Sequence, residues 1–330
     1  KQGILILSEL GEVPGIDHFG TQMLLEQIKE ENGRVLSINS YGSGIPSFES
    51  NNNPMGYKFS WDPLTVFVAA QTPAAYFKDG KKIFVPGDKL FENFWYVDIE
   101  DLGIFETYAN KDVEKYIEPF GLDKNISFYR GLLRYSGYCN NMRYMEELGL
   151  FKSDQKNDYS NTTFLQFTCA LVNASSDENI EKKVAEYLNL DINSDFIHRM
   201  KWLGLFDDVQ IPLETGSNLN VLLNRMLQRM SYAKGEKDMI ILHIEIIAEF
   251  EGGVKEKRIA TMVAKGIPYG DTAMSRVVAL PTAIASRLIV DGKIKAKGLR
   301  MPPNMPELFK PALAELKEHG LEFTTKRIIL

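Results

Sequence analysis

The stretch 239–250, MIILHIEIIAEF, alternates in polarity in the way that a half-buried β-strand does. Gly252-Gly253 follows it and favours a tight turn, after which residues 257–265 can return as a second strand. The stretch therefore predicts an antiparallel hairpin with one strongly apolar face. That face would carry Ile240, Leu242, Ile244 and Ile246.

Far upstream of this hairpin, the first forty residues predict a strand, a helix and another strand. Residues 3–7 form a short continuous apolar run, which is typical of a buried strand. Asp17 is a suitable N-cap for a helix that Asn32-Gly33 would end, and residues 34–41 alternate again. This order of elements favours a mixed α/β sheet.

Helical patterns replace strand patterns between residues 140 and 235. Apolar residues there recur at helical spacing, which predicts a small all-α insertion with a core stripe rather than a cofactor site. Two more helices, at about 272–291 and from Pro311 to Gly320, would cover the sheet. The predicted fold class is α/β (α+β): a mixed sheet with an antiparallel meander covered by helices, plus the insertion. The stripe consists of Leu219, Leu222, Leu223, Met226, Leu227 and Met230.

The composition is that of a soluble globular protein and argues against several classes of partner. Apolar residues make up 44% and charged residues 25%, with a net charge of −6. No basic block suggests nucleic acid or a membrane surface, and no run of 18 apolar residues suggests a membrane span. Cys139 and Cys169 form neither a disulfide framework nor a metal-binding spacing, so we expect a reducing, cytoplasmic location. The chain starts at Lys1 rather than at a methionine and enters a strand at once, so we expect its N-terminus to be a cut end.

The usual dinucleotide-binding motif is missing from the sequence. No Gly-x-Gly-x-x-Gly follows a predicted strand. Gly42-Ser43-Gly44 comes nearest, but it leads into Ile45-Pro46, which cannot open a helix at once. We therefore expect no cofactor-binding residues in this chain.

Two of the histidines stand near other polar side chains. His243 shares a strand face with Glu245 and Glu249, but alternate polar residues are typical of a half-exposed strand, so no metal site is predicted. His18 follows the expected cap Asp17 at a junction where a side chain can face a ligand. A structural role for His18 is the favoured interpretation.

Arg130 and Arg134 lie in a segment that can form a strand. They are four residues apart, an even number, so on a strand they share one face. Two guanidinium groups side by side suit a substrate with carboxylates, because each can bind one of them bidentately. A pair of surface salt bridges explains the same spacing, and the residues alone do not decide between the two.

Several motifs, in order and over nearly the whole chain, resemble those of saccharopine reductases, the NADP-dependent, glutamate-forming saccharopine dehydrogenases. They begin with Val13-Pro14-Gly15-Ile16-Asp17-His18 and Ser40-Tyr41, and continue with Tyr57-Lys58-Phe59-Ser60-Trp61, Tyr108-Ala109-Asn110-Lys111-Asp112, Arg130-Gly131, Arg134-Tyr135 and Trp202-Leu203-Gly204-Leu205-Phe206.

The resemblance implies an oxidoreductase of lysine metabolism. It implies that a Rossmann domain that binds NADP precedes this segment. Residues 1–139 and 236–298 would form a mixed α/β domain for substrate binding and dimerisation, and residues 140–235 the helical insertion. Residues 299–330 would pack back toward the Rossmann domain. The reaction joins aminoadipate semialdehyde to glutamate as an imine and reduces it, or runs in reverse, so the expected ligand is a small, carboxylate-rich amino acid.

The resemblance also assigns substrate-binding residues and suggests Glu12 as a catalytic candidate. It implies no cofactor-binding residue and no metal ligand in this chain. A homodimer built on the sheet of 239–250 and 257–265 is expected. The implied substrate-binding residues are Asp17, Gly42, Ser43, Ser60, Trp61, Asn110, Lys111, Arg130, Gly131 and Arg134.

Four pocket positions depart from the family pattern. The family has an aspartate at the position of Val13 and a cysteine at that of Gly42. It has an arginine at the position of Lys111 and a threonine at that of Leu132. Glu12, beside Val13, replaces the lost carboxylate only if its side chain turns inward, which the sequence leaves open. Two alternatives therefore remain open: an oxidoreductase of this fold that acts on another amino-acid imine, and a non-catalytic assembly module used for dimerisation.

Overall fold

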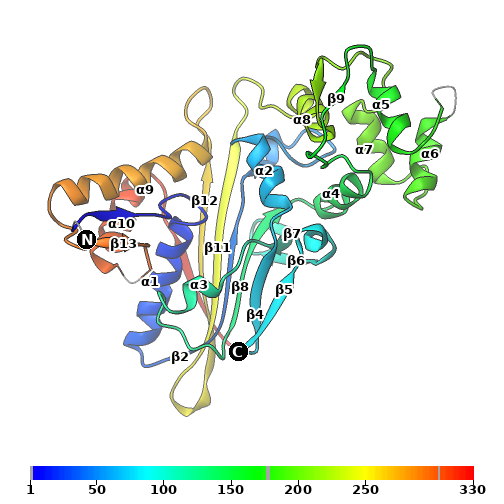
Figure 1. Ribbon diagram of the computed structural model, residues 1–330. Helices are drawn as coiled ribbons and strands as arrows, with labels where there is room; N and C mark the ends of the chain where they lie inside the picture. The colour runs from blue at the N-terminus through cyan, green and yellow to red at the C-terminus, as the bar shows by residue number, and fades with distance from the viewer. Residues whose placement is uncertain (1–2, 176–178, 304) are drawn as a thin grey trace.

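The computed structural model describes residues 3–175, 179–303 and 305–330 (Figure 1). Its centre is a mixed sheet of ten strands. The strands of this sheet are β2 (Arg34–Gly42), β3 (Ile45–Pro46), β4 (Ala74–Lys78), β5 (Lys81–Val85), β6 (Phe94–Ile99), β7 (Gly103–Ala109), β8 (Ser127–Arg134), β11 (Asp238–Glu249), β12 (Lys255–Lys265) and β14 (Thr324–Ile329).

The main path through the sheet runs β14-β12-β11-β2-β8-β4-β5. β11 and β12 form the predicted antiparallel hairpin, in which Ile244 lies opposite Ala260. β2 and β8 run parallel and place Ser40 beside Arg130, so the sheet is mixed. The predicted fold class is confirmed. The hairpin β6–β7, which joins β8, and the edge strand β14 have no counterpart among the predicted elements.

Three helices cover one face of the sheet: α1 (Ile16–Glu30), α9 (Ala273–Val290) and α10 (Pro306–Glu318) (Figure 1). α1 begins one residue before Asp17, with Gly15 at the cap, so the prediction of Asp17 as N-cap is wrong. The predicted start of α10 at Pro311 is wrong as well, because Pro306 already occupies the first turn. A two-stranded parallel sheet of β1 (Leu5–Leu7) and β13 (Gly298–Arg300) lies beside these helices.

α9 has the length and composition of a membrane span, with 18 residues and a mean hydropathy of 1.4. It also packs in the core, where 39% of its residues are buried. Val277 and Leu288 are completely buried among residues of β11, α1 and α10. Core helices of globular domains pass the same test of length and composition, so these two features alone do not indicate a membrane span.

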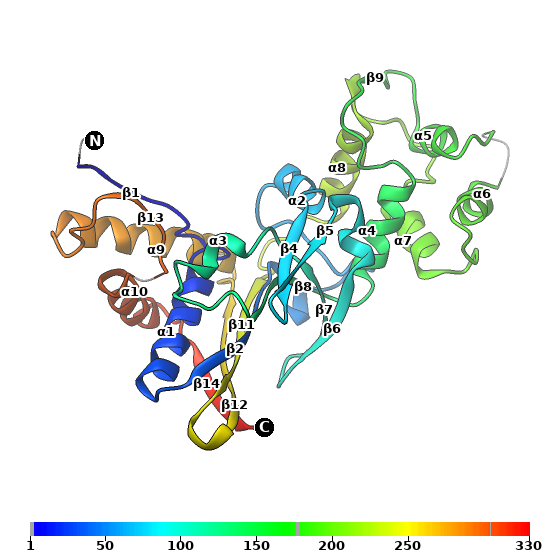
Figure 2. The same ribbon diagram turned by 60° about the horizontal axis from the view of Figure 1, so that its bottom comes forward.

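The helical insertion forms a lobe at one end of the sheet (Figure 2). Of the predicted Met and Leu stripe, five residues are buried in its core and Leu227 is 42% exposed. The stripe is therefore core, as predicted, except at that position. The helices of the lobe are α4 (Tyr138–Glu147), α5 (Phe164–Leu171), α6 (Ile180–Tyr187), α7 (Asp195–Leu203) and α8 (Asn218–Arg229), with the short strands β9 (Asn157–Asp158) and β10 (Thr215–Gly216).

Candidate functional site

A cavity of about 550 Å³ lies where the loop before α1 meets the ends of β7 and β8 and the helix α2 (Pro63–Ala70). The start of α9 closes one side through Met274 and Val278. Of the residues predicted from the sequence, Glu12, Trp61, Asn110, Lys111 and Arg134 line this cavity. These five come from four separate parts of the chain, and the fold brings them together.

Arg134 is a buried cation at the end of β8, and it lines the cavity. Its guanidinium carbon lies 5.2 to 5.8 Å from the ring centres of three tyrosines, Tyr57, Tyr108 and Tyr138. Nη1 donates to the backbone oxygen of Leu133 at 2.8 Å, and Nε has no partner in the part of the chain that the structure describes. No described carboxylate forms an ion pair with Arg134, so its charge can be met by an anionic ligand.

Arg130 lies on the same strand, and its surroundings differ. Its Nε donates to Oδ2 of Asp17 at 2.9 Å, and both side chains are about 1% exposed. The backbone N–H of Gly15 donates to the other oxygen of Asp17 at 2.7 Å. Burial alone would raise the pKa of Asp17, but the charges of Arg130 and His18 lower it below its ordinary value. Arg130 and Asp17 thus form a buried ion pair beside the cavity.

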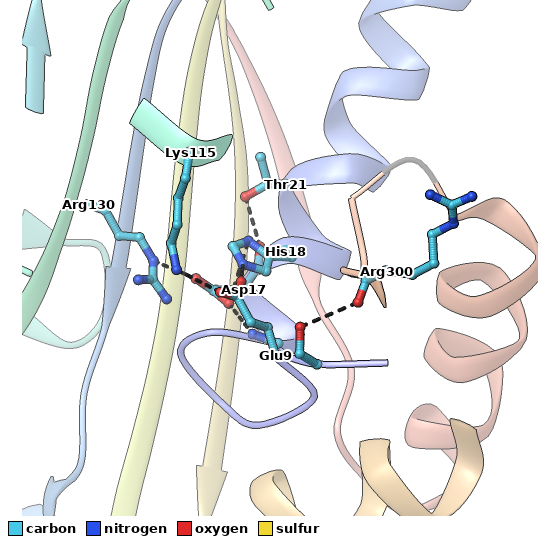
Figure 3. A network of polar contacts seen from close by, with 9 residues as sticks. Glu9, Asp17, His18, Thr21, Lys115, Arg130 and Arg300 are labelled. Carbon is cyan, nitrogen blue, oxygen red and sulfur yellow. Dashed lines mark hydrogen bonds and ion pairs between the residues drawn. The ribbon is translucent and has the colours of Figure 1, made fainter. Parts of the chain in front are cut away.

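A chain of polar contacts extends from this pair toward the surface (Figure 3). Nζ of Lys115 donates to Glu9 at 2.7 Å, and the other oxygen of Glu9 lies 3.2 Å from Nε2 of His18. Burial would raise the pKa of Glu9, but the hydrogen bonds with His18 and Lys115 lower it to about 2. His18 also packs against the ring of Tyr116 at 4.6 Å. The network favours a structural role for His18.

Glu12 turns inward and lines the cavity. Its Oε1 is buried and has no partner in the described part of the chain. Burial, together with the charge of Asp17, raises the pKa of Glu12 to about 8, although the charges of Arg134 and Arg130 act in the opposite direction. The carboxyl group is therefore mostly neutral at pH 7. A neutral acid with an unpaired oxygen in a cavity can donate a proton to a ligand.

Val13 and Gly42 are coupled by their packing. A Cβ atom added at Gly42 would lie 2.4 Å from Cγ2 of Val13, closer than real side chains approach. Val13 thus fills the space that a side chain at position 42 would need. Val13 and Leu132 both line the cavity, which gives it an apolar wall at two of the positions that depart from the family pattern.

Two of the remaining predicted residues have structural explanations. Oγ of Ser43 accepts from the backbone N–H of Ile241 at 2.8 Å, which ties the end of β2 to β11. A Cβ atom at Gly131 would lie 2.5 Å from both Oγ1 of Thr107 and the hydroxyl oxygen of Tyr129, so only glycine fits there.

Three further residues were assigned to the site from the sequence. Oγ of Ser60 is buried without a partner in the described part of the chain. The backbone N–H of Asn110 donates to the backbone oxygen of Arg130 at 2.9 Å, which ties the end of β7 to β8. Lys111 has a φ of 60°, a left-handed conformation, and is exposed at the rim.

Four further residues line the cavity although no sequence pattern predicts a role for them: Glu9, Tyr108, Lys115 and Tyr116. The hydroxyl oxygen of Tyr116 is buried without a partner among the described residues, as is that of Tyr57 beside Arg134. Glu9 and Lys115 are 106 residues apart, so no local spacing could have paired them.

His243 sits in ordinary contacts on β11. Its Nδ1 lies 2.8 Å from Oγ1 of Thr261, and Glu245 accepts from Lys257 at 3.0 Å. Among the described residues, no three side chains of the kinds that ligate metals come together.

A dinucleotide site needs a strand, a glycine-containing loop and a helix N-terminus in succession. The N-terminus of α1 comes nearest to this arrangement, because β1 precedes it through a loop with Gly11 and Gly15. Asp17 lies in the first turn, and its carboxylate already holds the N–H of Gly15. A buried carboxylate there repels a pyrophosphate. These residues do not fit a nicotinamide dinucleotide.

The family model for the saccharopine dehydrogenase C-terminal domain matches residues 11–321. The chain belongs to the saccharopine dehydrogenase family. It is 33% identical over 333 residues to the mitochondrial alpha-aminoadipic semialdehyde synthase of Bos taurus, covering 99% of this chain and 36% of that protein. It is 31% identical over 336 residues to the saccharopine dehydrogenase [NADP(+), L-glutamate-forming] of Saccharomyces cerevisiae, covering 99% of this chain and 75% of that protein. The chain thus spans about a third of the length of the bovine relative.

A solved structure agrees with this assignment. The apo saccharopine dehydrogenase (L-Glu forming) from Saccharomyces cerevisiae matches with a TM-score of 0.88 at 29% identity, over 99% of this chain and 74% of that one. A homospermidine synthase from Legionella pneumophila in complex with NAD has a TM-score of 0.56 at 10% identity. The second likeness shows a shared fold alone. The yeast enzyme therefore shares the fold of nearly the whole chain.

Proposed function

We propose that this chain is the substrate-binding and dimerising part of an NADP-dependent oxidoreductase of lysine metabolism. The reaction would join aminoadipate semialdehyde and glutamate through an imine, or release them from saccharopine. The observation that carries the proposal is Arg134, a buried guanidinium that forms no ion pair with any described residue and faces a cavity with Lys111 at its rim. The names of the yeast and bovine relatives support the substrate class.

The geometry supports distinct roles for the residues of the cavity. A carboxylate of the substrate would bind Arg134, whose Nε has no partner among the described residues, and a second would reach Lys111. Reduction of a carbon–nitrogen double bond adds a hydride to carbon and a proton to nitrogen. Glu12 is placed to give that proton, and in the reverse direction to take it back. The hydride must come from a cofactor held outside these residues.

Replacing Glu12 with glutamine is the test of this function in the complete enzyme. We expect kcat for the reductive direction to fall by roughly 10²- to 10⁴-fold, as for the loss of a general acid. The wild-type rate should decline as the pH rises through about 8, where Glu12 loses its proton. The glutamine variant should lack that decline. The pH profile with saturating semialdehyde, glutamate and NADPH measures both effects.

Glu12→Asp is the matched control, because it keeps an acid at the same place and should retain part of the rate and a pH-dependent decline. A Glu12→Gln enzyme with the kcat and pH profile of the wild type would show that Glu12 donates no proton. No turnover of saccharopine or of its two precursors by the wild-type enzyme would refute the proposed function itself.

The apolar wall of Val13 and Leu132 favours a second candidate, an oxidoreductase of the same mechanism that acts on another amino-acid imine. An apolar wall suits methylene groups better than a further charged group. The same assay with other amino acids in place of glutamate separates the two candidates, since the preferred substrate has the larger kcat/KM.

We also propose a homodimer formed through the sheet face opposite α1 and α10. On β12, Ile259 and Val263 (37% exposed) lie on the face opposite Met262 and Ala264, which pack against the helices, and a partner's sheet would shield both. We expect sedimentation at micromolar concentration to give twice the chain mass of 37.4 kDa. Val263→Arg should shift the protein toward monomer, whereas Val290→Arg, at an exposed position of α9, should not. A wild-type chain that sediments only as monomer refutes the dimer.

A further inference from the structure

A second cleft, of about 200 Å³, lies between α4 and α7 in the helical insertion. It shares no lining residue with the cavity that contains Arg134. Its walls include Asn141 and Tyr144 from α4, and Ser194, Asp195 and Arg199 from the start of α7. Cavities of about 300–1,000 Å³ hold drug-sized ligands, so this cleft suits a smaller molecule.

Two neutral polar groups of the cleft have unmet hydrogen-bonding capacity. Asn141 is 3% exposed, and its Oδ1 has no partner in the part of the chain that the structure describes. Oγ of Ser194, the cap residue of α7, is likewise buried and unpartnered there, and makes no cap hydrogen bond. Buried polar atoms in native proteins are nearly always satisfied, so two in one cleft indicate a ligand or solvent that satisfies them.

The cleft also carries one charge of each sign. Asp195 and Arg199 are one turn apart on α7, and they form no ion pair with each other. The guanidinium of Arg199 donates through Nη1 to the backbone oxygen of Gly137 at 2.6 Å, and no described carboxylate pairs with it. A cation and an anion on one wall, a turn apart, match a small molecule that has both charges.

We propose that this cleft binds a free α-amino acid. Its carboxylate contacts Arg199, and its ammonium group lies between Asp195 and Oδ1 of Asn141. The side chain rests on the aromatic pair Tyr144 and Phe196, whose ring centres are 5.2 Å apart. Arg199 is half-buried and makes one hydrogen bond among the described residues, to the backbone oxygen of Gly137, while Asp195 is exposed. A ligand that carries both charges can therefore contact Arg199, Asp195 and Asn141 at once, which neither a simple anion nor a simple amine can do.

The cleft borders the start of α4, which also supports Arg134 in the first cavity. Arg199 bonds to Gly137, and the next residue, Tyr138, packs on Arg134 at 5.2 Å. The N–H of Gly137 also donates to Glu106 at 2.6 Å. An amino acid in the cleft would therefore contact the same helix start that supports Arg134. The proposal itself does not depend on the proposed reaction.

Isothermal titration of the full chain with L-glutamate, L-lysine, L-leucine and glycine tests the site. We expect saturable binding of at least one of them. Arg199→Ala should weaken it by about tenfold or more, as expected when a charged hydrogen bond is lost, and Asp195→Asn should weaken it as well. Lys201→Ala is the matched control, since it removes a cation of α7 that pairs with Glu181 outside the cleft. Its affinity should equal that of the wild type.

Derivatives of the amino acid that lack one of its two charges test whether the cleft recognises both charges. The N-acetyl form and the amide of the best amino acid should each bind at least about tenfold more weakly. Equal binding of acetate alone, or of the N-acetyl form, would show an anion site and overturn the proposal. The same follows if no amino acid binds below 10 mM, a limit of roughly 3 kcal/mol, or if Arg199→Ala and Asp195→Asn both bind like the wild type. Circular dichroism of each variant establishes that it is folded.

Discussion

Replacing Arg134 with alanine in the complete enzyme should raise the substrate concentration for half-saturation by about 30-fold to several thousand-fold. The physical reason is that a buried carboxylate would lose its charged partner, which costs roughly 2–5 kcal/mol. Arg134 is 3% exposed and has no ion pair among the described residues, so no protein carboxylate competes for it. Steady-state kinetics with varied amino-acid substrate measures the change.

Arg134→Lys should fall between the wild type and the alanine variant. It keeps the charge but loses the planar fork that lies against Tyr57 and Tyr138. Arg143→Ala is the matched control, because Arg143 lies over Tyr144 on α4 and does not line the cavity. Half-saturation that stays at the wild-type value in Arg134→Ala would place the carboxylate site elsewhere.

The local pattern of the sequence was enough to predict the centre of the fold. The alternation in 239–250 predicts β11 because one face of this strand is entirely apolar and the period of two admits no helix. β14 carries no such pattern, since most of its residues, Thr324–Ile329, are exposed. Its strand conformation comes from pairing with β12, which is 59 or more residues away in the chain. Only the assembled sheet shows where that edge strand lies.

In the candidate site, too, local spacing predicts some features, whereas others depend on residues far away in the sequence. The even spacing of Arg130 and Arg134 predicts that they share a strand face, and the neighbouring odd positions, Tyr129 and Leu133, pack together in a separate cluster. The spacing cannot tell which of them has a protein partner. That depends on Asp17, which is 113 residues from Arg130. The local preference of Asp17 for a cap position gave way to this buried ion pair, because α1 starts one residue earlier.

We therefore expect Arg130 to contribute mainly to the stability of the folded protein. Arg130→Ala leaves the buried carboxylate of Asp17 without its partner, and breaking a buried pair in this way costs about 3–5 kcal/mol. Urea unfolding followed by fluorescence measures the change in the free energy of unfolding. Lys89→Ala, which removes an exposed ion pair with Glu92, is the control and should change that free energy little.

A double variant separates the pair from the packing around it. Arg130→Met with Asp17→Asn removes both charges, so it should be more stable than Arg130→Ala, and the two single changes should be strongly non-additive. The pair also predicts a pH dependence. The folded-state pKa of Asp17 lies below its ordinary value of 3.8, so the stability that it contributes is present above that value and is lost as the pH falls through the folded pKa.

The wild type should therefore lose its advantage over Arg130→Ala in acid, and the two unfolding curves should converge. If Arg130→Ala instead keeps wild-type stability at pH 7 and alters only substrate binding, Arg130 contacts the ligand directly through Nη1 and Nη2. Both of those nitrogens have no partner in the described part of the chain. The unfolding midpoint of the variant, measured with and without saccharopine, distinguishes a stabilising ion pair from a substrate ligand, because a bound ligand stabilises only the protein that holds it.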